Sequence, residues 1–77
     1  MKAQNLNLYS TSHCHLCEQA ELILKNVNLV SLTIIEIADN NHLLELYGPR
    51  IPILKRMDTM AELDWPFSVT EVIFFLR

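Results

Sequence analysis

The two cysteines of this 77-residue chain, Cys14 and Cys17, both lie in the short segment SHCHLCEQA. A disulfide between residues this close closes too small a loop to restrict much of the unfolded chain. The fold must therefore rest on an apolar core, although a chain of this length buries only about 60% of the surface that its unfolded form exposes. With 51% hydrophobic residues and one glycine, the composition suits a single globular domain over residues 1–77. The cysteine pair is then more suited to chemistry than to holding the fold together.

The spacing of apolar residues predicts seven secondary-structure elements. Strands are predicted over 6–9, 32–38, 51–55 and 59–63, and helices from Cys14 onward, over 40–47 and over 69–76. Strands joined through a helix normally run parallel, whereas strands joined by a short turn, here at 56–58, run antiparallel. We therefore expect an α/β fold with a mixed four-stranded sheet, in the order strand-helix-strand-helix-strand-strand-helix.

The boundaries of the later helices are marked by particular residues. Asp39 is placed to cap the second helix, and Gly48 and Pro49 follow its last turn. Ser68 and Glu71 have the spacing of a capping box at the start of the third helix. These residues predict both ends of the second helix and the start of the third.

The apolar faces of the first and last helices follow the helical period. They consist of Leu16, Ala20, Ile23, Leu24 and Val27 in the first helix, and Val69, Val72, Ile73 and Leu76 in the last. The first strand is less regular, because Asn5 and Asn7 flank Leu6 where a central strand usually has a more continuous apolar run. The two asparagines are unexplained by the pattern.

Charge and hydropathy exclude several classes of function. The formal net charge is -3, and the six Lys and Arg residues form no basic stripe, so we expect no nucleic-acid partner. The longest fully apolar run, VIFFL, is too short to cross a bilayer, and the N-terminal segment has no apolar stretch typical of a signal peptide. We expect a cytoplasmic monomer without a membrane partner, in a compartment where structural disulfides are rare.

The position of the cysteines favours thiol–disulfide exchange. Residues three apart on the first turn of a helix have Cα atoms roughly 5 to 6 Å apart, which suits a disulfide. The free N–H groups at a helix N-terminus stabilise a thiolate at Cys14, and His13 or His15 would add to this effect when protonated. Cys17, one turn further along the helix, is better placed to resolve a mixed disulfide than to attack a substrate.

Two alternatives remain open for the same residues. His13, Cys14, His15 and Cys17 are four candidate ligands for Cu(I) or zinc, although adjacent ligands are difficult to direct at one ion, and the other candidate, His42, is distant in sequence. Heavy-metal-associated domains carry a similar cysteine pair after their first strand but end in a strand, whereas this chain is predicted to end in a helix. The third possibility is a redox-inactive adaptor with an inert pair.

Over nearly its whole length the chain resembles a glutaredoxin-like protein of the thioredoxin-fold superfamily. The resemblance rests on CHLC after the first strand, where glutaredoxins carry CPYC, on RIP at the start of the third strand, where they carry TVP, and on the element order. It implies a three-layer thioredoxin-like fold and a thiol–disulfide oxidoreductase, with Cys14 as nucleophile and Cys17 as resolving thiol. It also implies that Pro52 is a cis proline facing the two cysteines.

The same resemblance sets expectations for substrate and cofactor. His13, His15 and Ile51 are expected to contact the substrate, with the backbone N–H and C=O of Ile51 pairing with an extended chain. Substrates would be protein or low-molecular-weight disulfides, a separate reductant would restore the thiols, and no cofactor would be bound. Glutaredoxins hold glutathione with a Gly-Gly turn and acidic residues, where this chain has LDWPFS, so glutathione is expected to be a poor co-substrate.

Overall fold

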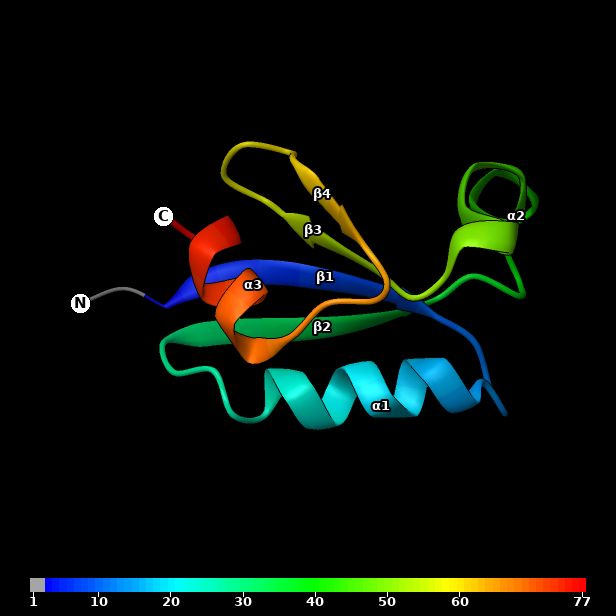
Figure 1. The fold of residues 1–77 in the computed structure, drawn as a ribbon. Coiled ribbons are helices and arrows are strands. Elements are labelled where there is room, and N and C mark those ends of the chain that lie inside the picture. Colours follow the sequence, from blue (N-terminus) through cyan, green and yellow to red (C-terminus); the bar gives the residue numbers. More distant parts are fainter. Residues whose placement is uncertain (1–2) are drawn as a thin grey trace.

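The computed structural model describes residues 3–77 as a four-stranded sheet packed between helices (Figure 1). The strands are β1 (Gln4–Ser10), β2 (Val30–Glu36), β3 (Ile53–Arg56) and β4 (Glu62–Asp64). The helices are α1 (His15–Leu24), α2 (Asn41–Tyr47) and α3 (Val69–Phe75), with a short 3-10 turn, η1 (Gly48–Arg50), after α2. The predicted order of strands and helices is confirmed. No helix within residues 3–77 has the length and apolar character needed to cross a bilayer.

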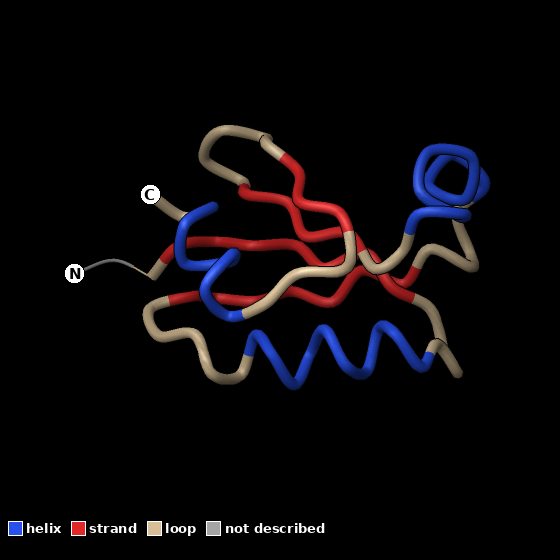
Figure 2. The backbone as a smooth tube through the Cα atoms, viewed as in Figure 1, coloured by secondary structure: helices blue, strands red, loops and turns tan. Residues whose placement is uncertain are grey.

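The strands of the mixed sheet follow the order β2-β1-β3-β4 (Figure 2). β1 pairs with β2 in parallel and with β3 in antiparallel orientation, and β4 completes the antiparallel part. Leu8 of β1 is opposite Leu54 of β3 and Tyr9 is opposite Ile53. Because successive side chains in a strand point to opposite faces, these two pairs contribute to two different cores.

The larger core lies on the face covered by α1 and α3. Its buried members are Leu6, Leu8, Ala20, Leu24, Val27, Leu54, Phe67 and Val72. The smaller core, on the opposite face, is formed where α2 packs against one end of the sheet, and its buried members are Tyr9, Ile37, Tyr47 and Ile53. Helices thus cover both faces, and the three-layer arrangement is confirmed.

The incomplete cover of the second face explains the two asparagines of β1. Asn7 points to the same face as Tyr9 but lies further from α2, and its neighbours across the sheet are Thr33 and Lys55. Asn5 is exposed, with Ser31 as its neighbour on β2. A helix as short as α2 covers only the carboxyl end of β1, so the rest of this face remains polar and solvated.

The start of α2 differs from the prediction by one residue. Asn40, not Asp39, is the N-cap, and its side-chain oxygen accepts the N–H of Leu43 at 3.0 Å. A cap of this kind accepts an N–H from the second or third helical residue, which only the residue directly before Asn41 can reach.

The predicted fourth strand is displaced and shortened. Residues 59–61 lie in the connection between the strands, because the N–H of Met60 donates to the Arg56 carbonyl at 2.8 Å and the Arg56 N–H donates to the Ala61 carbonyl at 2.9 Å. Met60 has a left-handed backbone with a φ of 65°. The turn is therefore longer than 56–58, and β4 begins only at Glu62.

Two residues of the predicted apolar faces are exposed. Leu16 on α1 is 45% exposed and Ile73 on α3 is 47% exposed. The inward position on the first turn of α1 is occupied by Cys17, which is 1% exposed. Leu16 is the preceding residue, so it lies about 100° around the helix from Cys17 and on the edge of the buried face.

Candidate active site

The cysteines follow β1 through a loop that is hydrogen-bonded to the end of β2. The carbonyl of Ser10 accepts the N–H of Ile37 at 3.0 Å, which extends the pairing of the parallel strands beyond their ends. The hydroxyl of Thr11 then donates to Glu36 at 2.7 Å. His13, directly before the first cysteine, has a left-handed backbone with a φ of 59°. This loop determines how the chain reaches α1.

Cys14 is the N-cap of α1, as the sequence predicted for a residue at the helix N-terminus. Its backbone is extended, and its Sγ accepts the N–H of Cys17 at 3.2 Å. The sulfur therefore takes the place that a serine or aspartate oxygen occupies in most caps. A thiolate at this position is stabilised by the N–H group and by the positive end of the helix dipole.

The two cysteines form a disulfide, and their Cα atoms are 5.2 Å apart. The two sulfur-bearing residues differ in exposure, because Cys14 is half-buried at the surface whereas Cys17 is only 1% exposed. A reagent or a substrate that approaches from solvent can reach Cys14 more easily. The geometry thus separates an outer cysteine from an inner one.

Glu36 is bound by groups on both sides of it in the sequence. Its Oε1 accepts the Thr11 hydroxyl at 2.7 Å and the N–H of Ala38 at 2.9 Å. The hydroxyl of Ser12 lies 3.5 Å from Oε2. These donors, first Thr11 and then Ala38, lower the pKa of the Glu36 carboxyl below its ordinary value, so it is ionised at neutral pH.

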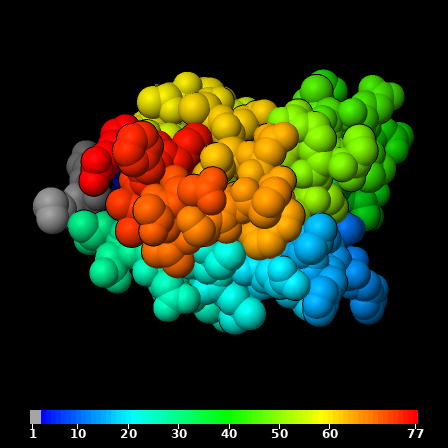
Figure 3. All heavy atoms as spheres, viewed as in Figure 1, coloured from blue at the N-terminus to red at the C-terminus, as the bar shows by residue number. Residues whose placement is uncertain are grey.

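Pro52 lies at the same end of the sheet as the cysteine loop. The register of β1 and β3, continued by one residue beyond the Tyr9–Ile53 pair, places Pro52 opposite Ser10. The Ile51–Pro52 bond is cis, as expected, and Pro52 is buried. Figure 3 shows this end of the surface, where the blue segment at the start of α1 lies below the green segment that includes α2 and η1.

The backbone of Ile51 is only half available to a substrate. Its N–H donates to the carbonyl of Tyr47 at 3.0 Å, so the expectation that this N–H would pair with an extended chain is wrong. The Ile51 carbonyl makes no hydrogen bond with any of residues 3–77. The 3-10 turn after α2 uses the N–H to end the helix, which leaves the carbonyl as the free group.

A network of ionic and hydrogen-bonded groups ties η1 to β4. Arg50 binds Asp64 with two nitrogens, at 2.9 and 3.3 Å, and lies 3.4 Å from Glu62. The hydroxyl of Tyr47 donates to the other oxygen of Glu62 at 2.5 Å. Burial of Tyr47, together with this hydrogen bond and the charge of Glu62, raises its pKa to about 12. The carboxylate of Asp64 is therefore already paired with the Arg50 guanidinium.

The two histidines beside Cys14 are both exposed. The Nδ1 of His15 lies 3.8 Å from a carboxylate oxygen of Glu18, and both side chains are largely solvated. Within residues 3–77, no three His, Cys, Asp or Glu side chains are grouped as a metal site requires. The described residues thus provide no preformed set of ligands for Cu(I) or zinc.

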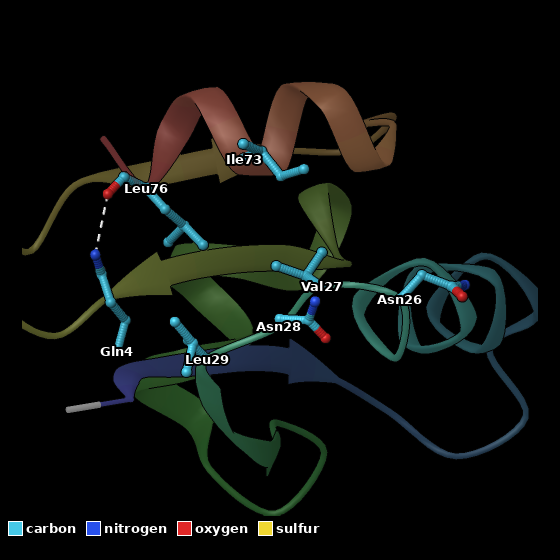
Figure 4. Close-up of a pocket in the computed structure, with 7 residues that line it drawn as sticks. All are labelled: Gln4, Asn26, Val27, Asn28, Leu29, Ile73 and Leu76. Atoms are coloured by element: carbon cyan, nitrogen blue, oxygen red, sulfur yellow. Dashed lines mark hydrogen bonds between the residues drawn. The ribbon is translucent and has the colours of Figure 1, made fainter. Parts of the chain in front are cut away.

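A cavity lies at the opposite end of β1 from the cysteines (Figure 4). It has a volume of about 420 Å³ and lies between α3 and the connection from α1 to β2, with Leu29, Ile73 and Leu76 among its lining residues. In this view the Gln4 side chain donates to the Leu76 carbonyl. Neither cysteine lines this cavity, and Cys14 lies half-buried at the other end of β1.

The structure brings most of the predicted site residues to one end of the sheet. His13, Cys14, His15 and Cys17 are neighbours in the chain, while Ile51 and Pro52 arrive through the register of β3. Nothing in the sequence marks Glu36 or the partner of Arg50 as part of this region. Their contacts join residues 25 and 14 positions apart, and no local pattern marks such pairs.

The comparisons with known proteins agree with this geometry. The family model of the glutaredoxin-like domain (DUF836) matches residues 5–77. Protein XcR50 from X. campestris, solved by X-ray crystallography, is 35% identical with a TM-score of 0.86, over 92% of this chain and 93% of that one. The solution structure of XcR50 covers 92% of this chain and 90% of its own, with 35% identity and a TM-score of 0.83.

A more distant structure extends the comparison. Protein Ne2328 from Nitrosomonas europaea, solved by NMR, is 29% identical with a TM-score of 0.77, over 97% of this chain and 93% of that one. No curated protein matches the chain. Because the family model covers almost all of the described residues and the sheet has the expected mixed topology, the chain has a thioredoxin-like fold and belongs to the glutaredoxin-like family.

Proposed function

We propose that this protein is a cytoplasmic thiol–disulfide oxidoreductase that uses Cys14 as nucleophile and Cys17 as resolving thiol. The observation that supports it most is the unequal exposure of a disulfide-bonded pair at a helix N-terminus. The outer sulfur is accessible to a substrate and accepts an N–H, and the inner sulfur is shielded but within bonding distance of it. A catalyst needs this division, because attack and resolution are separate steps.

The proposed reaction transfers two electrons from the dithiol to a disulfide substrate. The Cys14 thiolate attacks one substrate sulfur, a mixed disulfide forms, and the other substrate sulfur leaves as a thiolate that takes up a proton. The Cys17 thiolate then attacks the Cys14 sulfur, which releases the second substrate thiol and leaves the Cys14–Cys17 disulfide. A separate thiol reductant must then reduce this disulfide to restore the starting state.

Differential alkylation of the reduced protein tests the roles of the two cysteines. We expect iodoacetamide to modify Cys14 well before Cys17, because Cys14 is the more accessible of the two and its thiolate is stabilised by an N–H group. Peptide mass spectrometry after partial labelling measures the two rates. Faster labelling of Cys17, or labelling of both only above pH ~8.5, would contradict the asymmetric mechanism.

Exchange with a model disulfide tests the reaction itself. Cys17→Ser should accumulate a mixed disulfide through Cys14, whereas Cys14→Ser should be inactive. In both variants a hydroxyl replaces the thiol at nearly the same size, so the fold should be retained. In Cys14→Ser the hydroxyl can still cap α1. An active Cys14→Ser variant would exclude Cys14 as the nucleophile.

We further propose that glutathione is a poor co-substrate. The segment 63–68 contains no glycine that would let a peptide backbone approach closely. Asp64, the acidic residue of this segment, is already bound by Arg50. Turnover of a glutathione mixed disulfide should be weak beside that of an ordinary glutaredoxin assayed in parallel, and comparable turnover would overturn this part of the proposal.

A further inference from the structure

The carboxylate of Glu36 joins two loops that leave the sheet beside the cysteines. On one side it accepts the Thr11 hydroxyl at 2.7 Å, and the Ser12 hydroxyl is 3.5 Å away. On the other side it accepts the N–H of Ala38 at 2.9 Å. Thr11 and Ser12 lead directly to the cysteine pair, so one exposed side chain at the end of β2 anchors the segment that places Cys14.

The backbone of this segment needs an anchor. His13 has a φ of 59°, in the left-handed region that residues with a Cβ rarely adopt. Such a conformation persists when surrounding contacts hold it. The side chain of His13 is exposed and makes no hydrogen bond with residues 3–77. On the side before it, the turn is held by the contacts of Thr11 and Ser12 with Glu36, and on the side after it by the bonds of Cys14 with Cys17.

We propose that Glu36 is a positioning residue for Cys14, an inference that rests on the proposed role of Cys14 as nucleophile. By anchoring Thr11 and Ser12, the carboxylate holds the turn in the conformation that makes Cys14 the N-cap of α1. There the sulfur accepts the Cys17 N–H at 3.2 Å. Once the disulfide is reduced, this N–H stabilises the Cys14 thiolate, so release of the anchor leaves more of the thiol protonated.

The sign of the effect distinguishes positioning from simple charge. A carboxylate that acted only through its negative charge would disfavour a nearby thiolate, and its removal would make Cys14 more reactive. A carboxylate that acts by holding the turn has the opposite effect, because its removal makes Cys14 less reactive. The two explanations thus predict changes of opposite direction for the same substitution.

The test measures the alkylation rate of Cys14 in the reduced protein from pH 5 to 10. Glu36→Ala removes the anchor and Thr11→Val removes its strongest donor. Each should slow alkylation at pH 7 by about threefold to tenfold, as the apparent pKa of Cys14 rises by about 0.5 to 1. Glu36→Gln keeps an acceptor oxygen without the charge and should stay close to wild type. Thr11→Ser, which keeps a hydroxyl, should do the same.

A double variant and a control complete the design. If Glu36 acts through Thr11, the double variant of Thr11→Val and Glu36→Ala should be no slower than Glu36→Ala alone. Glu45→Ala removes an exposed carboxylate of α2 and should leave the rate unchanged. Circular dichroism checks that each variant is folded, and Thr11→Val, a change of nearly equal volume, provides the test if Glu36→Ala does not fold.

The outcomes separate this inference from the proposed function. Unchanged or faster alkylation in both Glu36→Ala and Thr11→Val, or additive effects in the double variant, would overturn the positioning role while Cys14 remained the reactive cysteine. A wild-type protein in which Cys14 is no more reactive than Cys17 would instead overturn the proposed function, whatever the variants show. Slower alkylation rescued by Glu36→Gln and Thr11→Ser is the result that supports the inference.

Discussion

Tyr47 combines burial with a hydrogen bond to a carboxylate. It is 5% exposed, its ring lies 4.4 Å from that of Tyr9, and its hydroxyl donates to Glu62. Burial and the neighbouring negative charge both disfavour the phenolate, which raises the pKa of Tyr47 to about 12. The group therefore helps to hold α2 against β4 as long as the hydroxyl stays protonated.

A spectroscopic titration tests this property of Tyr47. The absorbance of tyrosinate should show a component that titrates near pH 12, and Tyr47→Phe should lack it. Because the folded pKa lies above the ordinary value of 10, the stability that the hydroxyl contributes is complete below pH 10 and is lost as the pH rises toward 12. The difference in urea midpoint between wild type and Tyr47→Phe should shrink over the same interval. A difference that stays constant to pH 12 would contradict the assignment.

For single residues, the sequence predicted the position in a helix or strand better than the hydrogen-bond or ion-pair partner. Cys14 was expected at a helix N-terminus and is the N-cap, because the strand, the polar loop and the helical period are all local signals. The pairing of Arg50 with Asp64 was not expected, since it depends on how η1 and β4 meet in space. The N–H of Ile51 was assigned to a substrate, but the end of α2 uses it.

The capping box of α3 is the boundary that the sequence marked most clearly. The Ser68 hydroxyl accepts the Glu71 N–H at 3.1 Å, and Glu71 accepts the Ser68 N–H at 3.2 Å. Ser68→Ala should lower the free energy of unfolding by about 1 kcal/mol, because it leaves an N–H of the first turn without its partner. Urea denaturation measures this loss. Glu71→Gln keeps an acceptor and serves as the control, and an equal loss in both variants would argue against the cap.

Arg56 attaches the other end of α3 to the sheet. It is 8% exposed, it binds Asp58 through two nitrogens, and it donates to the carbonyls of Phe75 and Arg77 at 2.7 and 3.1 Å. A helix leaves its last carbonyls without partners within the helix, and the guanidinium satisfies them here. Burial of this arginine on the α3 face was not apparent from the sequence.

Hydrogen exchange should show the effect of removing this attachment. Arg56→Met should lower the urea midpoint and should make the amides of α3 exchange faster than those of β1, since the helix loses its contact with β3. Lys55→Met, at the neighbouring position on the opposite face, is the matched control and should leave α3 protected. Equal acceleration in α3 and β1 would mean that Arg56 supports the whole fold and not the helix end.

The accuracy with which helix and strand boundaries were predicted depended on the local sequence motif at each boundary. The capping box spans four residues and was placed correctly, whereas the cap of α2 was expected at Asp39 and is Asn40. The fourth strand was placed too early, because the turn was expected to span only residues 56–58. The backbone of Met60 and Ala61 is instead held in the turn by hydrogen bonds with Arg56. Such bonds depend on the pairing of β3 with β4 and are not visible in a local pattern.

At the scale of the whole molecule, one core supports β1, β3, α1 and α3 together. Leu54 is fully buried between them. Leu54→Ala should lower the free energy of unfolding by about 2 to 5 kcal/mol, through lost burial and the cavity that remains. That is a large share of the total for a domain of this size. Leu44→Ala on α2, where the side chain is 39% exposed, should cost far less in the same urea experiment.

The overall topology could be predicted because few arrangements satisfy the connection rules. A strand-helix-strand unit and a hairpin that share one sheet require both parallel and antiparallel pairs, so a mixed sheet was expected, and the structure adds the strand order. The coverage of the two faces could not be predicted, because it depends on where α2 ends relative to the sheet. Asn5 and Asn7 are polar because α2 does not cover their part of the sheet face. This explanation became clear only from the structure.

The hydrogen bond between the Gln4 side chain and the Leu76 carbonyl brings the start of β1 close to the end of α3. Figure 1 shows that this junction lies at the opposite end of the molecule from the cysteine loop, and β1 itself spans about 20 Å between them. A tether to a solid support, or a fused reporter, placed after Arg77 would therefore leave the thiols facing open solution. A short peptide bridge across the junction would turn the chain into a ring, from which circular permutants could be cut at the exposed 57–61 connection.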